Sequence, residues 1–158
     1  MPKKERLSAG LLLFRRSSRG VEVLLAHPGG PFFKSKDLGA WTIPKCEPAK
    51  GEPLLAAAHR EFREETGFEA KGTELPLGQI TQKGGKIVHA WAVRGDADPR
   101  KLESNHFELE WPPGSGKQRS FPEVDRAEWF TLDEARRRVK AAQIPLIDTL
   151  EAWLSHER

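Results

Sequence analysis

The sequence has little of what marks several large classes of protein. Its 158 residues include one cysteine, Cys46, so an internal disulfide is excluded, which fits a reducing cytoplasm. No apolar run approaches the roughly 20 residues that a membrane-spanning helix needs. There is no internal repeat and no low-complexity tract. We therefore expect a cytoplasmic protein with no membrane segment, folded as a single domain over residues 1–158.

The charge balance is mildly basic, which alone leaves nucleic-acid binding possible. Lysine and arginine outnumber aspartate and glutamate by 26 to 23, which gives a net charge of +3. The chain has no recognised nucleic-acid motif and no aromatic-basic RNA signature. A mildly basic chain can still attract an anionic substrate. We expect a small-molecule anion as the partner, with no nucleic acid and no membrane.

One stretch concentrates acidic side chains on a predicted helix. Proline is tolerated in a first helical turn and glycine can take the left-handed cap conformation, so the helix should span Pro53–Thr66 and stop at Gly67. At about 100° per residue, Glu61, Glu64 and Glu65 share one face. A neighbouring apolar stripe should pack on the body of the domain. Its residues are Leu54, Leu55, Ala58 and Phe62.

The three carboxylates repel one another by a few tenths of a kcal/mol per pair. Two arrangements offset this repulsion. In the first, the helix face is solvated and forms i,i+4 pairs with Arg60 and Arg63. In the second, a hard divalent cation such as Mg²⁺ or Mn²⁺ bridges the acids. The helical spacing alone leaves both open.

The longer spacing around this helix resembles the signature box of the Nudix hydrolases. That box opens with a glycine six places before its first glutamate and continues, seven residues later, as Arg-Glu-apolar-x-Glu-Glu-x-Gly-apolar. Eight of the nine specified positions are met here, and the opening glycine is replaced by Cys46. The matching residues are Glu52, Arg60, Glu61, Phe62, Glu64, Glu65, Gly67 and Phe68.

The order of elements in the rest of the chain suggests an α+β fold or a mixed sheet sandwiched by helices. Alternating apolar residues and turn signals predict strands at residues 7–14, 21–26, 77–82, 87–93, 107–111 and 124–130. A capping box at Thr131 opens a helix, and a helical stripe of Leu146, Ile147, Leu150, Trp153 and Leu154 closes the chain. The Nudix resemblance implies an α/β/α sandwich with a mixed sheet.

The resemblance also implies a reaction: Mg²⁺-dependent or Mn²⁺-dependent hydrolysis of a phosphoanhydride bond in nucleoside or dinucleoside polyphosphates. It implies Glu64 and Glu65 as metal ligands, Glu61 as a ligand or general base, and Arg60 as a residue that orients a glutamate. A backbone carbonyl at Lys45 and a glutamate from a later loop would complete the metal site. The candidates for that glutamate are Glu110, which we rank first, Glu108 and Glu123.

Several lysines are candidates to bind substrate phosphates, although the two in the turn at residues 83–86 equally serve to keep a turn soluble. The candidates are Lys34, Lys36, Lys45, Lys83 and Lys86. No residue pattern in the sequence indicates which group is attached on the far side of the cleaved phosphoanhydride bond. A nucleotide sugar such as ADP-ribose, or a diphosphoinositol, therefore stays open as the substrate, and we expect a monomer or a homodimer.

Cys46 is the departure from the Nudix pattern. If its position requires a positive φ, cysteine costs about 1–2 kcal/mol there and can displace the Lys45 carbonyl. The alternative function is then a Nudix module that binds nucleotides without cleaving them. A thiol beside a hard-metal site is also a soft ligand that can capture Zn²⁺.

Overall fold

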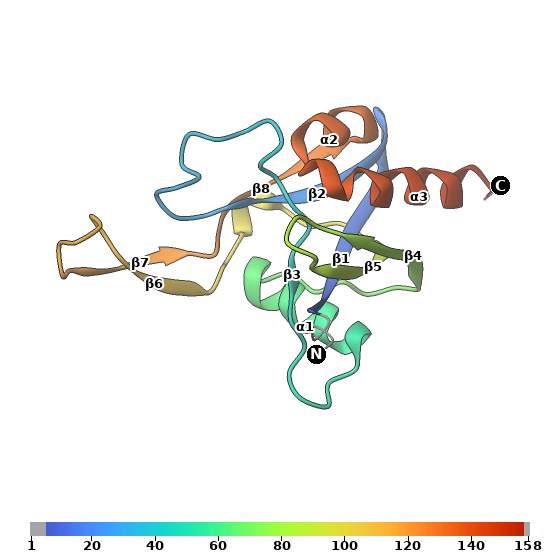
Figure 1. Ribbon diagram of the computed structural model, residues 1–158. Helices are drawn as coiled ribbons and strands as arrows, with labels where there is room; N and C mark the ends of the chain where they lie inside the picture. Colours follow the sequence, from blue (N-terminus) through green and yellow to red (C-terminus); the bar gives the residue numbers. More distant parts are fainter. Residues whose placement is uncertain (1–5, 157–158) are drawn as a thin grey trace.

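A six-stranded mixed sheet forms the centre of the protein in the computed structural model, which describes residues 6–156 (Figure 1). Its strands are β1 (Leu7–Ser17), β2 (Gly20–Pro28), β3 (Lys45–Cys46), β4 (Glu74–Thr81), β5 (Ile87–Arg94) and β8 (Val124–Thr131). The order is β4-β5-β1-β2-β8, with β3 paired to β1. Only β1 and β5 are parallel neighbours. Residues 1–5 and 157–158 of the predicted domain lie outside the described residues.

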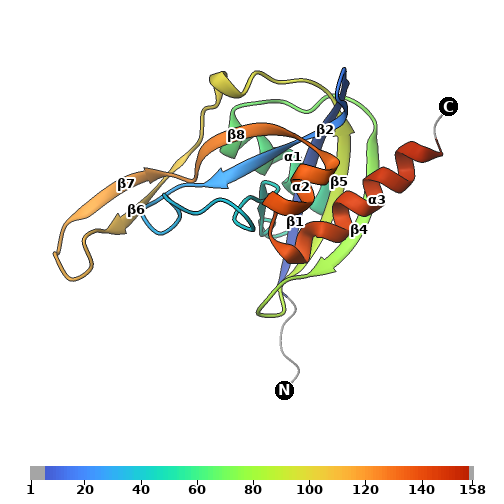
Figure 2. The ribbon, with the colours of Figure 1, turned by 90° about the horizontal axis from the view of Figure 1, so that it is seen from above.

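Helices cover both faces of the sheet, as Figures 1 and 2 show. They are α1 (Leu54–Thr66) on one face, and α2 (Leu132–Arg138) and α3 (Ile144–Ser155) on the other. Side chains of β1 alternate between the two faces: Leu11 packs with Phe62 of α1, while Leu12 packs with Leu150 of α3. The predicted α/β/α sandwich is confirmed. Within residues 6–156, no helix is long and apolar enough to cross a membrane.

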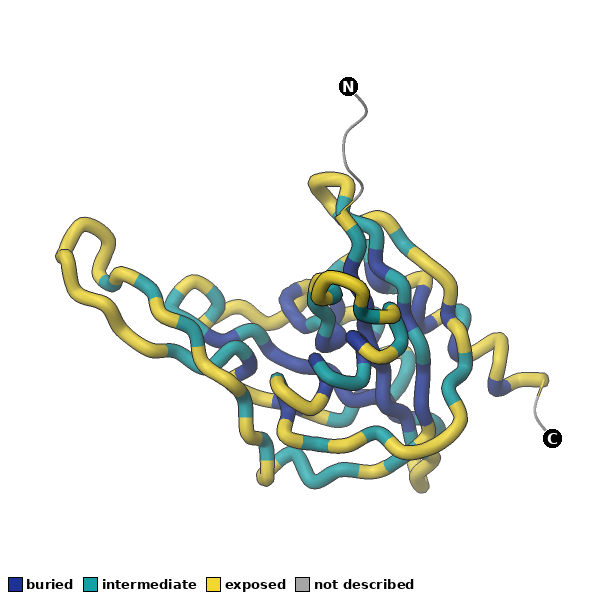
Figure 3. Tube along the Cα trace, turned by 90° about the horizontal axis from the view of Figure 1, so that it is seen from below, coloured by how far each residue is buried: buried dark blue, intermediate teal, exposed yellow. Residues whose placement is uncertain are grey.

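A separate two-stranded hairpin projects from the sandwich. It consists of β6 (His106–Glu110) and β7 (Gln118–Pro122), and most of its residues are exposed (Figure 3). The first strand was predicted from the alternation at residues 107–111. The second was missed because Gln118–Pro122 has no alternating apolar pattern and forms a strand only by pairing with β6.

The predicted closing helix is confirmed with one correction. Its buried stripe is Leu146, Ile147, Leu150 and Leu154. Trp153, which was assigned to that stripe, is 40% exposed, and its indole N–H donates to the Pro76 carbonyl oxygen at 2.8 Å. The capping box is present in part, because the Thr131 hydroxyl accepts a hydrogen bond from the Glu134 N–H at the start of α2.

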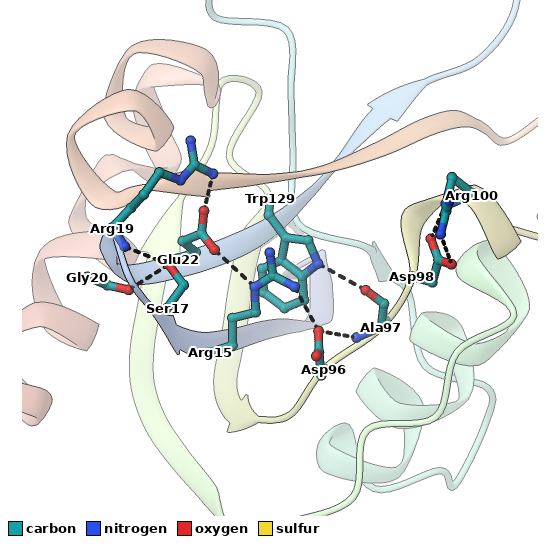
Figure 4. Close-up of polar contacts among 10 residues, drawn as sticks. All are labelled: Arg15, Ser17, Arg19, Gly20, Glu22, Asp96, Ala97, Asp98, Arg100 and Trp129. Carbon is teal, nitrogen blue, oxygen red and sulfur yellow. Dashed lines mark hydrogen bonds and ion pairs between the residues drawn. The ribbon is translucent and has the colours of Figure 1, made fainter.

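A buried carboxylate ties the β1–β2 hairpin together at the end away from β3. Glu22 is 1% exposed, accepts a hydrogen bond from Arg15 Nε at 3.0 Å, and also pairs with Arg19 (Figure 4). The Arg15 guanidinium also lies 4.2 Å from the centre of the Trp129 ring. Burial alone would raise the pKa of Glu22, but the two arginines outweigh burial and hold that pKa below its ordinary value.

This ion pair predicts an acid dependence of stability. As the pH falls, the unfolded protein takes up the proton first, so the pair stabilises the fold above the ordinary pKa of 4.5 and loses that contribution as the pH falls through the lower folded-state pKa. Glu22→Gln should therefore lose less unfolding free energy than the wild type between about pH 7 and about pH 3 in urea titrations. Glu128→Gln, exposed on β8, is the control. Equal losses in all three proteins would contradict the prediction.

Candidate active site

The acidic helix begins and ends where the sequence predicts, to within one residue. Pro53 is the residue before α1 and is extended, with ψ 144°. At the other end Gly67 has φ 77°, the left-handed conformation, and its N–H donates to the Arg63 carbonyl oxygen at 2.8 Å. These two ends fix the phase of the helix and therefore the directions of its glutamates.

The three helix glutamates occupy different environments. Glu61 is 8% exposed, Glu65 is half-buried and Glu64 is exposed. The Glu61 carboxylate lies close enough to Glu65 to accept a hydrogen bond from it when Glu65 is protonated, which raises the pKa of Glu65. The Glu64 carboxylate instead accepts a hydrogen bond from Arg60 Nη1 at 3.0 Å. The structure thus brings Glu61 and Glu65 together and turns Glu64 toward the arginine.

Glu123 is the later glutamate that reaches these acids. Burial, the hydrogen bond to Glu61 and repulsion from Glu61 and Glu123 raise the pKa of Glu65 well above its ordinary value. Burial and repulsion from Glu61 also raise the pKa of Glu123. The backbone explains the placement, because the Glu123 N–H donates to the Asn105 carbonyl oxygen at 2.8 Å and the Asn105 N–H donates to the Glu64 carbonyl oxygen at 3.0 Å.

The structure does not support the ranking of Glu110 as the first candidate, and it places Glu108 no nearer to the helix acids. Both lie on β6 in the projecting hairpin, and both are exposed. The Glu110 carboxylate accepts a hydrogen bond from the Gly116 N–H at 3.1 Å. Glu123 follows β7 directly, where the hairpin returns to the sheet. No sequence signal separated these candidates, because the turn back depends on the missed strand.

Arg60 connects the helix to the loop before it. Its Nε and Nη2 donate to the two carboxylate oxygens of Glu52 at 2.9 and 3.0 Å. Glu52 also accepts a hydrogen bond from the Ala49 N–H at 2.9 Å. The arginine and this backbone bond lower the pKa of Glu52 to about 2. Since Arg60 also donates to Glu64 and lies 3.9 Å from a Glu61 carboxylate oxygen, one side chain contacts three carboxylates.

Cys46 does not occupy a strained position. Among the residues that the structure describes, only glycines have a positive φ, and Cys46 lies in β3 opposite Ala9. The expected cost of about 1–2 kcal/mol is therefore absent. Its Sγ lies 3.5 Å from Arg60 Nη2. Burial and the neighbouring Glu61 carboxylate raise the pKa of the thiol to about 12, so it stays protonated at neutral pH and is a poor Zn²⁺ ligand.

We expect Cys46→Gly to lower the free energy of unfolding by about 1 kcal/mol, because glycine loses more backbone entropy and the packing of the thiol is removed. Activity should not rise, since there is no strain to relieve. The wild-type thiol should also react slowly with a thiol-specific reagent near pH 7 in the folded state and quickly in denaturant. A more stable or faster glycine variant would show that the cysteine does strain the loop.

The predicted phosphate-binding lysines separate into two sets. Lys34 and Lys36, in the loop after β2, and Lys83, in the β4–β5 turn, are exposed. Lys45 and Lys86 are half-buried and repel each other. Burial, followed by repulsion from Lys140 and Lys86, lowers the pKa of Lys45 to about 8, against the opposing attraction of Glu65 and Glu61. Lys45 is therefore the candidate lysine that lies next to the acids.

The acids near the end of α1 are potential metal ligands. Within residues 6–156, no group of three or more histidine, cysteine, aspartate or glutamate side chains is already arranged to hold one. The three acids that interact nevertheless offer only oxygen donors, the type that Mg²⁺ and Mn²⁺ prefer. They are Glu61, Glu65 and Glu123. Their burial and mutual repulsion are what a divalent cation would offset, so their chemistry fits one.

Comparisons with known proteins agree with the fold. A family model described as NUDIX domain matches residues 4–150. The fold is similar to a C. elegans Ap4A hydrolase in a binary complex, with 21% identity, a TM-score of 0.68, and coverage of 94% of this chain and 98% of that one.

Two further solved structures extend the comparison. The NUDIX domain of Shewanella oneidensis NrtR, complexed with ADP ribose, has 16% identity and a TM-score of 0.68 over 96% of this chain and 90% of that one. A MutT protein from Methanosarcina mazei has 18% identity and a TM-score of 0.61 over 97% and 99%. Identities this low establish the fold alone. The family match covers nearly the whole sequence, and this chain therefore belongs to the Nudix family.

Proposed function

We propose that this protein is a divalent-cation-dependent pyrophosphohydrolase that cleaves a phosphoanhydride bond in nucleoside or dinucleoside polyphosphates. The observation that carries the proposal is the group of buried and half-buried, mutually repelling acids at the end of α1, with Lys45 beside it. Such a group is costly unless a cation offsets it. A cation held there would in turn attract the phosphates of a substrate.

In this proposal Glu61, Glu65 and Glu123 hold the cation. When bound, a Mg²⁺ or Mn²⁺ ion supplies Lewis-acid stabilisation of charge on the phosphate oxygens. Glu61, the helix glutamate that the family resemblance allows as ligand or general base, is the carboxylate that would accept the proton of the attacking water. Arg60 binds Glu52 through two hydrogen bonds and so fixes the helix to the loop that precedes it.

Two of the named relatives bear on the substrate. One is described as an Ap4A hydrolase and another as complexed with ADP ribose. By analogy, both a dinucleoside polyphosphate and a nucleotide sugar belong in an assay panel, together with a nucleoside triphosphate and a diphosphoinositol. The alternative of a non-catalytic module depended on strain at Cys46, and the extended backbone of β3 removes that argument.

The test is release of phosphate or nucleoside monophosphate from this panel, with Mg²⁺, with Mn²⁺ and with chelator. Hydrolysis of at least one anhydride that stops with chelator supports the proposal. Tight binding of a nucleotide without product from any substrate would overturn it in favour of the binding module.

Glu64→Gln tests whether the exposed helix glutamate contributes to the reaction. If Glu64 moves from Arg60 to the cation during turnover, the variant should lose most of its activity while it keeps its thermal stability. Glu69→Gln, exposed just past the helix, is the matched control. Full activity in both variants would restrict the role of Glu64 to pairing with Arg60.

A further inference from the structure

Three lysines from distant parts of the sequence lie near one another, and one of them, Lys45, also lies near the acids. Lys45 belongs to β3, Lys86 to the β4–β5 turn, and Lys140 to the segment after α2. All three are half-buried. Lys45 is repelled by both other lysines, and Lys140 is repelled by Lys86. The sequence marked the first two as phosphate-binding candidates, but it gave no signal for Lys140, which follows a run of arginines.

A buried glutamine links the three segments that carry these lysines. Gln143 is 1% exposed. Its Oε1 accepts a hydrogen bond from the Ile43 N–H at 3.0 Å, two residues before Lys45. Its Nε2 donates to Thr42 Oγ1 at 2.8 Å and to Gln82 Oε1 at 2.9 Å. One side chain therefore uses its acceptor and both donors to join residues 42–43 to the β4–β5 turn.

Backbone hydrogen bonds connect the residues around Gln143 to two of the lysines. The Gln143 N–H donates to the Lys140 carbonyl oxygen at 2.8 Å, and the Lys140 N–H donates to the Trp41 carbonyl oxygen at 2.9 Å. The Gln82 N–H donates to the Lys86 carbonyl oxygen at 2.7 Å. Gln143 therefore bonds directly to the Lys140 backbone, reaches the Lys86 backbone through Gln82, and holds the chain two residues before Lys45.

The lysines differ from the half-buried arginines of the same protein. Arg15, Arg60 and Arg138 each pair with carboxylates at hydrogen-bond distance. In the described part of the chain, none of the three lysines forms an ion pair with a carboxylate. Like charges that are desolvated and unpaired repel one another, and a bound anion is the partner that would offset their repulsion.

The lysine group adjoins the proposed site of hydrolysis. Lys45 is attracted by Glu65 and Glu61 as well as repelled by the other two lysines, so it lies between the acids and the cations. A linear phosphate chain that crosses this boundary would place one phosphate at the acids and further phosphates at the lysines. A molecule with only two phosphates would leave part of the lysine group unused.

We propose that Lys45, Lys86 and Lys140, positioned by Gln143, form a subsite for the additional phosphates of a linear polyphosphate chain. The subsite makes the enzyme prefer substrates with three or more phosphates over diphosphate-linked compounds such as ADP-ribose. This inference rests on the proposed function for the position of the cleaved bond. In it, Lys140 contacts substrate and Gln143 is a positioning residue.

The first experiment measures kcat/KM of Lys140→Gln for a dinucleoside tetraphosphate and for ADP-ribose. The tetraphosphate value should fall roughly tenfold or more, as expected for the loss of a charged hydrogen bond, while the ADP-ribose value stays within a factor of two. Lys140→Arg should keep the preference. Lys101→Gln, an exposed lysine elsewhere, is the control. An unchanged ratio in Lys140→Gln would overturn the inference.

The second experiment separates this inference from the proposed function. Binding of inorganic tripolyphosphate and of pyrophosphate is measured by calorimetry in chelator, where no metal-dependent turnover occurs. Tighter binding of tripolyphosphate that Lys140→Gln weakens supports the subsite even if no nucleotide is hydrolysed. If nucleotides are hydrolysed but tripolyphosphate and pyrophosphate bind equally well, the subsite is contradicted while the proposed function is still supported.

Gln143→Met tests the positioning role. It should lower the ratio of tetraphosphate to ADP-ribose kcat/KM by a similar factor, because the lysine segments lose their common link. A purely structural role would lower thermal stability and both kcat/KM values together. That outcome would remove Gln143 from the subsite without affecting Lys140.

Discussion

Glu65→Gln is expected to lower kcat by roughly 10²–10³-fold, the size of effect seen when one group that stabilises developing charge is removed. The same change should make the metal-free protein more stable near neutral pH. The reason is that the folded state raises the pKa of Glu65, so ionising this carboxyl opposes folding, and a neutral amide avoids the repulsion from Glu61 and Glu123. Steady-state kinetics and urea denaturation give the two measurements.

Added Mg²⁺ should stabilise the wild type more than it stabilises Glu65→Gln. An ion that binds only the folded protein raises its stability by mass action. The wild type should therefore gain stability with added Mg²⁺, and Glu65→Gln should gain less. Glu69→Gln, four residues along the chain and exposed, should respond as the wild type does. If Glu65→Gln is less stable in chelator and is stabilised equally by Mg²⁺, then Glu65 is a structural acid and the proposed metal site is wrong.

Gly29→Ala should be the most damaging small substitution outside α1. A Cβ at Gly29 would lie 1.9 Å from the Pro122 carbonyl oxygen, which is backbone and cannot rotate away. The Gly29 N–H also donates to the Glu123 carbonyl oxygen at 2.9 Å. Relief of the clash therefore moves the segment that holds Glu123. We expect a loss of about 1–3 kcal/mol in unfolding free energy and, since a shift of about 1 Å can cost about 10²-fold, a comparable loss of kcat.

Gly95→Ala is the matched control for this prediction. Gly95, like Gly29, has no positive φ, so left-handed strain is absent from both comparisons. A Cβ at Gly95 would meet the Leu13 Cδ1 atom at 2.9 Å, which is the end of a flexible side chain. The control should lose less stability and keep its kcat. Equal losses in the two variants would mean that the contact of Gly29 with Pro122 has no special relation to Glu123.

Local patterns predicted much of this fold. The alternation of apolar residues located the two hairpins of the main sheet, and the glycine stop after the acidic stretch located the end of α1. Each of these signals lies within one element, where backbone geometry alone sets which side chains share a face. The same locality explains the two misses: β7 and the exposed Trp153 depend on contacts with distant residues.

The candidate site divides in the same way. The sequence by itself determined the Nudix box and the grouping of glutamates on one helix, because these depend on short spacings, and the resemblance carried by that box implied the α/β/α class. Only the tertiary structure decided that Glu123 rather than Glu110 meets Glu61, that Cys46 is unstrained, and that Lys140 joins Lys45. Those relations depend on where the chain turns back through long-range hydrogen bonds and burial, and no local pattern encodes that path.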